Sequence, residues 1–391
     1  GTGEVEAPRI VRLEGSPWEM GLAHGQLLGR DIHLLLDELE RRVFRRVDPV
    51  RSAGIRVLCR VLAAILNRHV PPRLRAELYG IAAGSGADYA DILLLNCLDD
   101  VLNILRRLAP RAPSLACSSF AIFGQRTFDG SVLHGRNLDY HFRGTPLDDG
   151  GAIARMLLAK SILFVHRPRG YAAFASIGWP GLAGVSTAMN EHGIAIGSLT
   201  SYVRGTTPNG TPATMIYRRI VEEARKIDET ASILRASRRT IGNNLLVSSG
   251  QENRPALFEI TMSAVEQVLP ADGVLVTTNH FASPRLARAQ RPYLLPHSVQ
   301  RCERLRSLCS RDRIHPDEAA RFLGDCDCPP GSGPFARVAN EGTAVSVLFQ
   351  PSEVRMWLGS ASHPPASHGA FIPLDLTFLL ANAQSIRERT A

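Results

Sequence analysis

Apolar residues recur at helical spacing through the first part of the chain. Across residues 18–46, leucines, isoleucine and methionine return every three or four positions, while Asp and Arg occupy the opposite face. The same period continues through residues 55–67, 72–83 and 88–107. The first 110 residues therefore predict an almost entirely helical segment.

After this segment the pattern changes to the alternation that is typical of strands. The proline-containing stretch 108–116 cannot continue a helix, and Cys117 follows it as the first residue of a predicted strand. A turn at 127–130 joins strands 118–123 and 131–139 into a hairpin. Further strands are expected at 161–166, 171–177, 183–189, 194–199, 244–248, 256–260, 264–268, 274–278, 343–349 and 353–358, with helices at 214–225, 228–236, 298–309 and 316–323.

Long runs of strands with helices set apart from them predict the α+β class. Such runs favour antiparallel meanders in a layered sandwich over a wound parallel sheet. No internal repeat, Walker loop or Gly-x-Gly-x-x-Gly fingerprint occurs in the 391 residues.

Composition narrows the class of partner. Apolar residues make up 45% of the chain and charged residues 21%, as in an ordinary globular protein with a sizeable core. The net charge is +8, but the basic residues are almost all arginines spread along the chain, so we expect no nucleic-acid partner. No run of 18 uncharged apolar residues is present, so we expect no membrane span. The start at Gly1 carries no signal peptide, which leaves a cytoplasmic protein and a secreted protein whose signal has been removed both open.

Seven cysteines, an odd number, argue against a fully paired disulfide framework and leave room for one reactive thiol. Cys326 and Cys328 flank a single Asp, a spacing that fits neither a zinc pair nor a redox motif. Two possibilities remain open for this pair, a disulfide within the loop or no bond at all. We expect no metal and no cofactor.

Cys117 is the sharpest chemical candidate. Alone, a cysteine at a strand start is usually a small buried apolar residue. Here the return strand of the hairpin carries Arg136 and Asp139, and a hairpin can bring them beside Cys117. A guanidinium favours thiolate, and a carboxylate can orient an ammonium group. The alternative is a salt bridge between Arg136 and Asp139.

The segments Cys117-Ser-Ser-Phe and Gly135-Arg-Asn-Leu-Asp139 resemble the mature start of N-terminal-nucleophile (Ntn) cysteine hydrolases. The similarity is to the acyl-coenzyme A:isopenicillin N acyltransferase family and, more distantly, to choloylglycine hydrolases and penicillin V acylases. Short motifs in matching order extend it over nearly the whole chain, at 15–25, 78–84, 178–184, 189–193, 278–281 and 345–358. The resemblance implies a four-layer αββα sandwich with a mostly helical N-terminal segment.

The resemblance also implies self-processing. The Cys117 thiol would attack the Ala116 carbonyl and so divide one integrated fold into an α subunit, residues 1–116, and a β subunit, residues 117–391. The resulting heterodimer could oligomerise further. The best-known acyltransferase has Gly at the position of Ala116, and alanine is also small. The new α-amino group titrates at roughly 7.7–8.0 when unperturbed, so it can serve as the base for its own thiol.

The implied reaction is cleavage of a linear non-peptide amide, an N-acyl amine or an N-acyl amino acid, through an acyl-thioester. Water or an acceptor amine would then resolve the thioester. Two other functions remain open, namely an uncleaved binding protein on the same fold and a phospholipase-B-like esterase.

Other residues take roles by resemblance. Asn279 is the expected oxyanion-hole donor, although it could cap a turn, and Asn243 and Asn244 compete with it. Arg301 matches a family arginine, although a surface arginine of a helix is the alternative. We assign substrate binding to three residues, the first two from a glycine-rich loop that could also be a plain turn: Trp179, Gly181 and Thr200.

Overall fold

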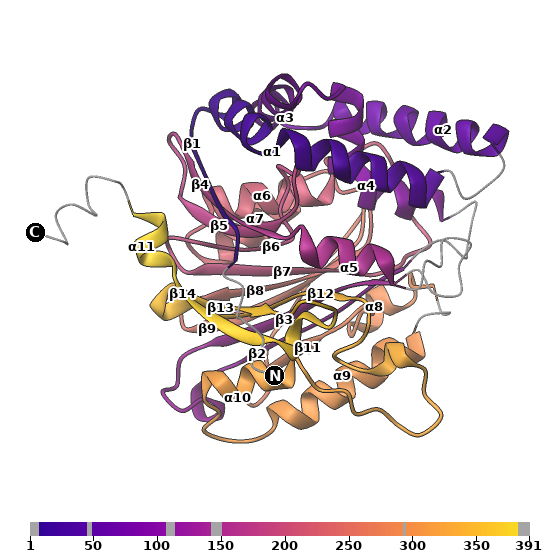
Figure 1. The fold of residues 1–391 in the computed structure, drawn as a ribbon. Coiled ribbons are helices and arrows are strands. Elements are labelled where there is room, and N and C mark those ends of the chain that lie inside the picture. Colours follow the sequence, from indigo (N-terminus) through magenta and orange to yellow (C-terminus); the bar gives the residue numbers. More distant parts are fainter. Residues whose placement is uncertain (1–7, 45–48, 107–113, 142–150, 292–294, 382–391) are drawn as a thin grey trace, which may run out of the picture.

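The fold is a four-layer sandwich of two stacked β-sheets with helices on both outer faces (Figure 1). It comes from a computed structural model, which describes residues 8–44, 49–106, 114–141, 151–291 and 295–381. The larger sheet has eight strands in the order β1(Ile10–Gly15), β4(Ile162–Pro168), β5(Phe174–Gly178), β6(Thr187–Asn190), β7(Ile194–Thr200), β8(Asn243–Ser249), β9(Arg254–Ile260) and β10(Val265–Val268).

The smaller sheet has six strands and carries the predicted hairpin. Its order is β11(Val274–Thr277), β2(Ser114–Ile122), β3(Leu133–His141), β12(Thr343–Gln350), β13(Arg355–Ser360) and β14(Ala370–Asp375). All strand pairs of both sheets are antiparallel except β1 with β4. The predicted α+β sandwich is therefore confirmed.

Helices cover both sheets. On the larger sheet lie α6(Ala213–Glu223) and α7(Ile227–Ala236), with the N-terminal helices α1(Pro17–Leu39), α2(Pro49–Asn67), α3(Pro72–Ser85) and α4(Tyr89–Leu105) above them in Figure 1. The smaller sheet is covered by α9(Leu295–Cys309) and α10(Pro316–Phe322). Three further short helices lie within the described ranges, α5(Ala152–Ala159), α8(Pro284–Ala287) and α11(Leu376–Leu380).

The N-terminal motifs that resemble the family have a packing role. Ser16 and Glu19 form a capping box that starts α1, and Pro17 takes its first position. A Cβ added at Gly21 would lie 2.1 Å from the Glu77 carbonyl oxygen, and one at Gly84 would lie 2.3 Å from the Leu22 carbonyl oxygen. The glycines therefore let α1 and α3 pack backbone against backbone.

The apolar core between the sheets surrounds the hairpin. Cys117 and Leu138 belong to the same buried cluster as residues of β4, β5, β7, β12 and β13. Separate clusters seal α6 and α7 onto the larger sheet, and α9 and α10 onto the smaller one. The outer layers thus hold β2 and β3 in the middle of the molecule.

Several predicted boundaries were wrong. Strand β2 begins at Ser114, so Cys117 is its fourth residue and not its first; residues 108–113 of the expected linker lie outside the described residues. The first helix continues as a π-helical turn, Glu40–Phe44, and residues 45 and 46 are also outside them. The almost entirely helical N-terminal segment also contributes β1, which pairs with β4 from beyond Cys117. Its apolar alternation spans only six residues, and the short elements α5, α8, β14 and α11 were also missed.

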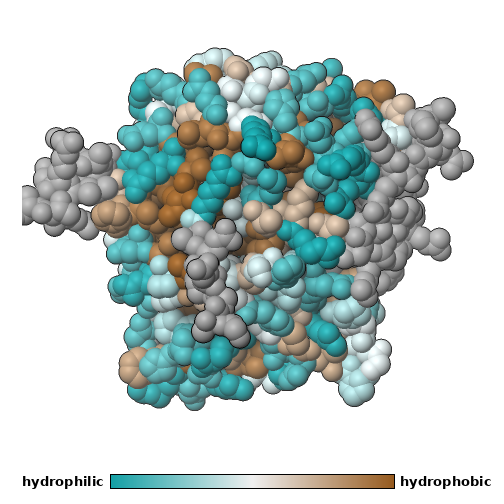
Figure 2. Space-filling model, in the orientation of Figure 1, coloured by the Kyte–Doolittle hydropathy of each residue, from teal (hydrophilic) through white to brown (hydrophobic). Residues whose placement is uncertain are grey.

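The surface face in Figure 2 is mostly hydrophilic, and most strongly apolar residues gather in its upper half, where Figure 1 places the N-terminal helices. Several large exposed apolar side chains belong to those helices, among them Trp18, Leu27, Leu34, Val57 and Val61. No helix within the described ranges is both long and apolar enough to span a bilayer.

Candidate active site

Strands β2 and β3 sort the candidate residues onto two faces. Cys117 lies opposite Leu138 and Ser119 opposite Arg136 in the antiparallel register. Because side chains alternate along a strand, Arg136, Leu138 and Tyr140 share the face of Cys117. Cys117 and these three residues line one cavity between the sheets. The predicted hairpin thus places Arg136 beside Cys117.

Behind the strand, a buried hydrogen-bond network holds the backbone of Cys117. Its N–H donates to Asn279 Oδ1 at 2.8 Å, and Arg301 Nη2 donates to the same oxygen at 2.6 Å. Arg301 also donates to Ser118 Oγ at 3.1 Å and to the Phe335 carbonyl oxygen. With three acceptors and 2% exposure, Arg301 is not the surface arginine of the alternative interpretation. The fork of a guanidinium can hold several acceptors in fixed geometry, which makes this network rigid.

Asn279 uses both ends of its amide. While Oδ1 faces Cys117, Nδ2 donates to the Thr200 carbonyl oxygen at 2.9 Å. Its side chain therefore bridges the two sheets and does not cap its own turn. Asn244 Nδ2 donates to the carbonyl oxygens of Thr278 and His280, so it secures the segment that carries Asn279. Asn243 lies opposite Thr200 in the register of β7 and β8.

Arg136 is fully buried and directed at the larger sheet. Its Nη1 donates to Thr187 Oγ1 and its Nη2 to the Ser198 carbonyl oxygen. Among the described residues no ion pair joins it to Asp139, so the predicted alternative of a salt bridge is wrong. The positive charge instead lies within electrostatic range of the Cys117 thiol and lowers its pKa in part.

Asp139 occupies the other face of β3. Its Oδ2 accepts from Asn340 Nδ2 at 3.0 Å, while its buried Oδ1 has no hydrogen-bond partner. Burial raises the pKa of this carboxyl to about 6, against the opposing effect of Arg301. Asp139 lies opposite Ala116 in the register of the two strands, next to the Ala116–Cys117 bond. An oxygen without a partner at this bond could accept a new hydrogen-bond donor.

Burial dominates the acidity of Cys117. Desolvation raises the pKa of its thiol to about 11, although Arg136, a backbone N–H of Asp139 and Arg301 oppose the shift. The thiol of the uncleaved chain is therefore protonated at neutral pH, and it needs a base to react as a thiolate.

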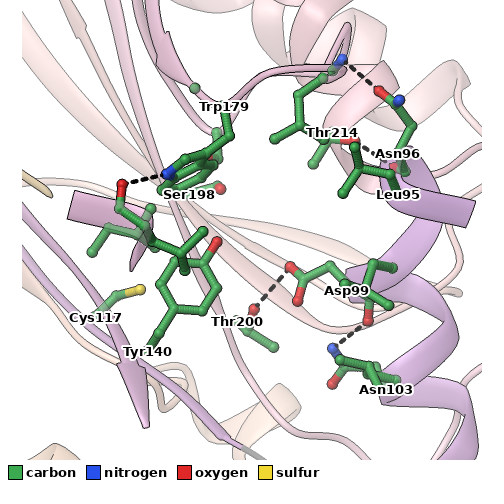
Figure 3. A pocket seen from close by; sticks show the side chains of 18 of the residues that line it. Leu95, Asn96, Asp99, Asn103, Cys117, Tyr140, Trp179, Ser198, Thr200 and Thr214 are labelled. Atoms are coloured by element: carbon green, nitrogen blue, oxygen red, sulfur yellow. Dashed lines mark hydrogen bonds between the residues drawn. The ribbon is translucent and has the colours of Figure 1, made fainter. Parts of the chain in front are cut away.

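The cavity beside Cys117 has a volume of about 150 Å³ and a mostly apolar wall. Its apolar lining comes from both parts of the chain, with Leu35, Leu39, Leu95 and Leu102 before Cys117 and Leu138, Ile153, Leu157, Ile177, Trp179 and Leu182 after it. Trp179 is fixed by a 2.7 Å hydrogen bond to the Leu157 carbonyl oxygen and by edge contact with Tyr140 (Figure 3). A cavity of this size and polarity can hold a group about as large as benzene.

Of the residues expected to bind substrate, Trp179 and Thr200 line this cavity. Gly181 instead faces the N-terminal helices, where its N–H donates to His24 Nε2 at 2.8 Å and its carbonyl oxygen accepts from Asn96 Nδ2 at 2.8 Å. Its φ of +87° favours glycine, and an added Cβ would lie 2.9 Å from Leu95 Cδ2. The geometry at Gly181 thus supports a turn that fixes the loop.

Sequence reasoning missed most polar residues of the cavity, among them Tyr140, Asp99, Asn103 and Arg106. Tyr140 directly follows the motif that ends at Asp139, and strand alternation from Arg136 could have placed it in the cavity. Asp99, Asn103 and Arg106 come from α4, and nothing local to that helix indicates that it contacts β7. Asp99 Oδ2 accepts from Thr200 Oγ1 at 3.5 Å.

All seven cysteines are free, so Cys326 and Cys328 form no loop disulfide. In the part of the chain that the structure describes, no three His, Cys, Asp or Glu side chains come together as a metal site would require.

Curated relatives align with most of the chain. A protein of unknown function from Archaeoglobus fulgidus is 26% identical over 89% of this chain and 63% of its own length. The 40 kDa form of acyl-coenzyme A:6-aminopenicillanic-acid-acyltransferase from Emericella nidulans is 23% identical over 87% of both chains. The chain spans between half and two thirds of the length of the first curated relatives that it matches.

Solved structures also align. The N-acylethanolamine-hydrolyzing acid amidase ortholog of Caenorhabditis elegans aligns with a TM-score of 0.44 and 16% identity, over 60% of this chain and 93% of its own.

The family model for acyl-coenzyme A:6-aminopenicillanic acid acyl-transferase matches residues 129–363, which include Arg136, Asp139, Asn279 and Arg301. This match covers more than half of the sequence, and the chain therefore belongs to the acyl-coenzyme A:6-aminopenicillanic acid acyl-transferase family.

Proposed function

We propose that this chain is a self-processing amide hydrolase or acyltransferase whose nucleophile is Cys117. One observation carries the proposal. The Cys117 nitrogen is held at 2.8 Å from Asn279 Oδ1 while the same residue lines an apolar cavity. The nitrogen that would become the α-amino group is thus already fixed in a buried polar network, and its side chain borders the space for a substrate.

Self-processing begins with the thiol of Cys117. Its sulfur attacks the Ala116 carbonyl carbon, the peptide C–N bond breaks as the thiol proton passes to the Cys117 nitrogen, and a thioester joins the two segments. Water hydrolyses this thioester, which leaves the Ala116 carboxylate and a free Cys117 amine. The unpartnered Oδ1 of Asp139, buried beside this bond, would accept a hydrogen bond from the new ammonium group.

Substrate turnover uses the same sulfur with its own amine as base. The α-amino group takes the thiol proton as sulfur attacks the amide carbonyl, and it returns that proton to the leaving nitrogen as the C–N bond breaks. Because burial raises the thiol pKa to about 11 in the uncleaved chain, this neighbouring base is what makes attack at neutral pH feasible. Water or an acceptor amine then releases the acyl group from sulfur.

Asn279 is our assignment for stabilising the oxyanion. Its Nδ2 now donates to the Thr200 carbonyl oxygen, and it would exchange this bond for one with the negative charge that develops on the substrate oxygen. Arg301 donates to Asn279 Oδ1 and so keeps the side-chain amide in place, with its Nδ2 directed toward the larger sheet. Removing one such donor typically costs roughly a hundredfold or more in rate.

The cavity indicates a small acyl group. A wall that is mostly leucine, isoleucine and tryptophan suits an apolar acyl part that fills only a portion of the cavity. The substrate class is an N-acyl amine or N-acyl amino acid. Both segments of the chain line the cavity, so the active form would be a heterodimer of the two fragments.

A denaturing gel with active-site labelling tests the proposal. The purified chain should separate into fragments of 116 and 275 residues, and Cys117→Ala should remain a single band. A chromogenic acyl anilide should be turned over by the wild type and by Cys59→Ala, which removes another buried cysteine, but not by Cys117→Ala. An uncleaved wild type that is still active would contradict self-processing. A Cys117→Ala protein that retains turnover would contradict the assigned nucleophile.

A further inference from the structure

The wall of the cavity opposite Cys117 carries one carboxylate that the proposed mechanism does not use. Asp99 belongs to α4, which precedes Cys117 in the chain, and it lines the same cavity as Cys117. Figure 3 shows its carboxylate directed toward Thr200 at the side of the cavity away from Trp179. The cavity therefore has an apolar end around Trp179 and a polar end around Asp99.

Asp99 retains most of its capacity to accept hydrogen bonds. Among the described residues, its carboxylate accepts one hydrogen bond, from Thr200 Oγ1 at a long 3.5 Å. An ionised carboxylate offers about four acceptor sites on its two oxygens. Asn103 does not take these sites, since its Nδ2 donates to the backbone oxygen of Asp99.

Among the described residues no hydrogen bond joins the two arginines of the lining to Asp99, although both charges lie near enough to lower the pKa of its carboxyl. Both terminal nitrogens of Arg136 donate to groups of the larger sheet, Thr187 Oγ1 and the Ser198 carbonyl oxygen. Arg106, at the end of α4, stacks its guanidinium over the Tyr202 ring at 3.9 Å. Asp99 is thus the charged side chain of the polar end that has acceptor sites to offer to a ligand.

Tyr140 lines the same cavity as Asp99 and Cys117. Its ring packs edge-on against Trp179, and its hydroxyl points into the cavity in Figure 3. Burial raises its pKa, and both Asp99 and Cys117 lie close enough to raise it further. A substrate whose carbonyl carbon reaches Cys117 would therefore bring its amine part within reach of Asp99 when its acyl part fills the apolar end.

Resting on the proposed function, we infer that Asp99 is a specificity-determining residue that binds a hydrogen-bond donor on the amine part of the substrate. The donor is an ammonium or hydroxyl group a few bonds from the amide nitrogen. A carboxylate at the same place would be repelled, so the inference selects substituted N-acyl amines over N-acyl amino acids.

Four amides that share one acyl group test this inference. Their amine parts are propylamine, ethanolamine, 1,3-diaminopropane and glycine. The wild type should cleave the ethanolamine and diamine amides with at least tenfold higher kcat/KM than the glycine amide. Asp99→Asn should reduce this preference about tenfold for the diamine amide, mainly through KM, and should leave the propylamine amide within threefold. A faster reaction of the ethanolamine amide than of the diamine amide would identify the hydroxyl as the preferred donor.

The order in which the wild type prefers the four amides can be measured even if the variant does not fold. A preference of the wild type for the glycine amide would overturn the inference. Equal changes for all four amides in Asp99→Asn also overturn it, because a merely structural role would act on every substrate. These outcomes differ from failure of the proposed function, in which none of the four amides would show turnover that depends on Cys117.

Discussion

The two sides of the cavity are built from different parts of the chain and in different ways. Around the Cys117 nitrogen, residues from beyond position 116 form a buried network in which Asn279 and Arg301 each bond several groups. Across the cavity, α1 and α4 supply mostly leucines together with Asp99. The first side has little freedom to change, because each hydrogen bond fixes the next.

This difference separates chemistry from selectivity. Polar networks that are fully bonded specify one geometry, which suits a reacting centre. An apolar wall specifies only volume and shape, and it tolerates substitution if the volume is kept. We therefore expect changes after position 116 to affect kcat and changes before it to affect the choice of substrate.

The largest expected effect concerns a buried ion cluster that joins the two segments. Arg218 of α6 donates to Glu222 Oε1 at 2.8 Å and to Glu77 Oε2 of α3 at 3.1 Å, and all three side chains are buried. Arg218→Met would leave the buried carboxylate of Glu77 without its cation and Glu222 with Arg73 alone. We expect a loss of roughly 3–5 kcal/mol in the free energy of unfolding, measured by urea denaturation.

The next residue in the chain gives a matched control for this prediction. Arg219 pairs with Glu223 at the same i,i+4 spacing, but both side chains are about one-third exposed. Arg219→Met should cost roughly 0–1 kcal/mol, because water already solvates this pair. Equal losses in the two variants would show that the segments do not depend on the buried cluster.

A smaller effect, on rate alone, is expected at Arg301. Arg301→Met removes one of the two donors that hold Asn279 Oδ1 and so loosens the amide. We predict a fall in kcat of roughly 10²–10³ with KM within threefold, measured by steady-state kinetics on a chromogenic amide. Arg304→Met in the same helix is the control, since its ion pair with Asp325 is partly exposed. A kcat for Arg301→Met within threefold of the wild type would contradict a positioning role.

The sequence predicted the side of the cavity that depends on local order. Cys117, Arg136 and Asp139 lie in one hairpin, so period-two alternation and a short turn bring them near each other. The side that depends on distant packing was missed. Asp99 reaches the cavity only because α4 lies against β7, and Glu77 meets Arg218 only because α3 packs over α6. The sequence of a helix shows which of its faces is apolar, but it does not show which element will cover that face.

The assignment of Arg301 also shows that local sequence does not predict which side chains become buried. Its helix carries several arginines with similar local surroundings, and nothing in their spacing separates a buried one from its exposed neighbours. The resemblance selected it, and only the position of α9 against β2 explains its burial. Burial of a long charged side chain depends on acceptors from elsewhere in the chain, here Ser118, Asn279 and Phe335.

The smallest expected effect tests selectivity at the helical wall. A second cavity of about 220 Å³ adjoins the first, and Leu39, Leu95 and Leu98 line both. Leu95→Ala would remove side-chain volume from this shared wall and lengthen the space for an acyl chain. We expect the ratio of kcat/KM for a long over a short acyl amide to rise about tenfold, with kcat on the short amide almost unchanged.

Leu93 is the matched control, because it is a buried leucine of the same helix that packs into the N-terminal helical core and not into either cavity. Leu93→Ala should destabilise the fold by roughly 2–5 kcal/mol without changing the acyl-length ratio. If both variants shift the ratio alike, the effect comes from loosening of α4 and not from the shared wall. If only Leu95→Ala shifts it, the segment before Cys117 sets the length of the acyl group while the segment after it performs the reaction.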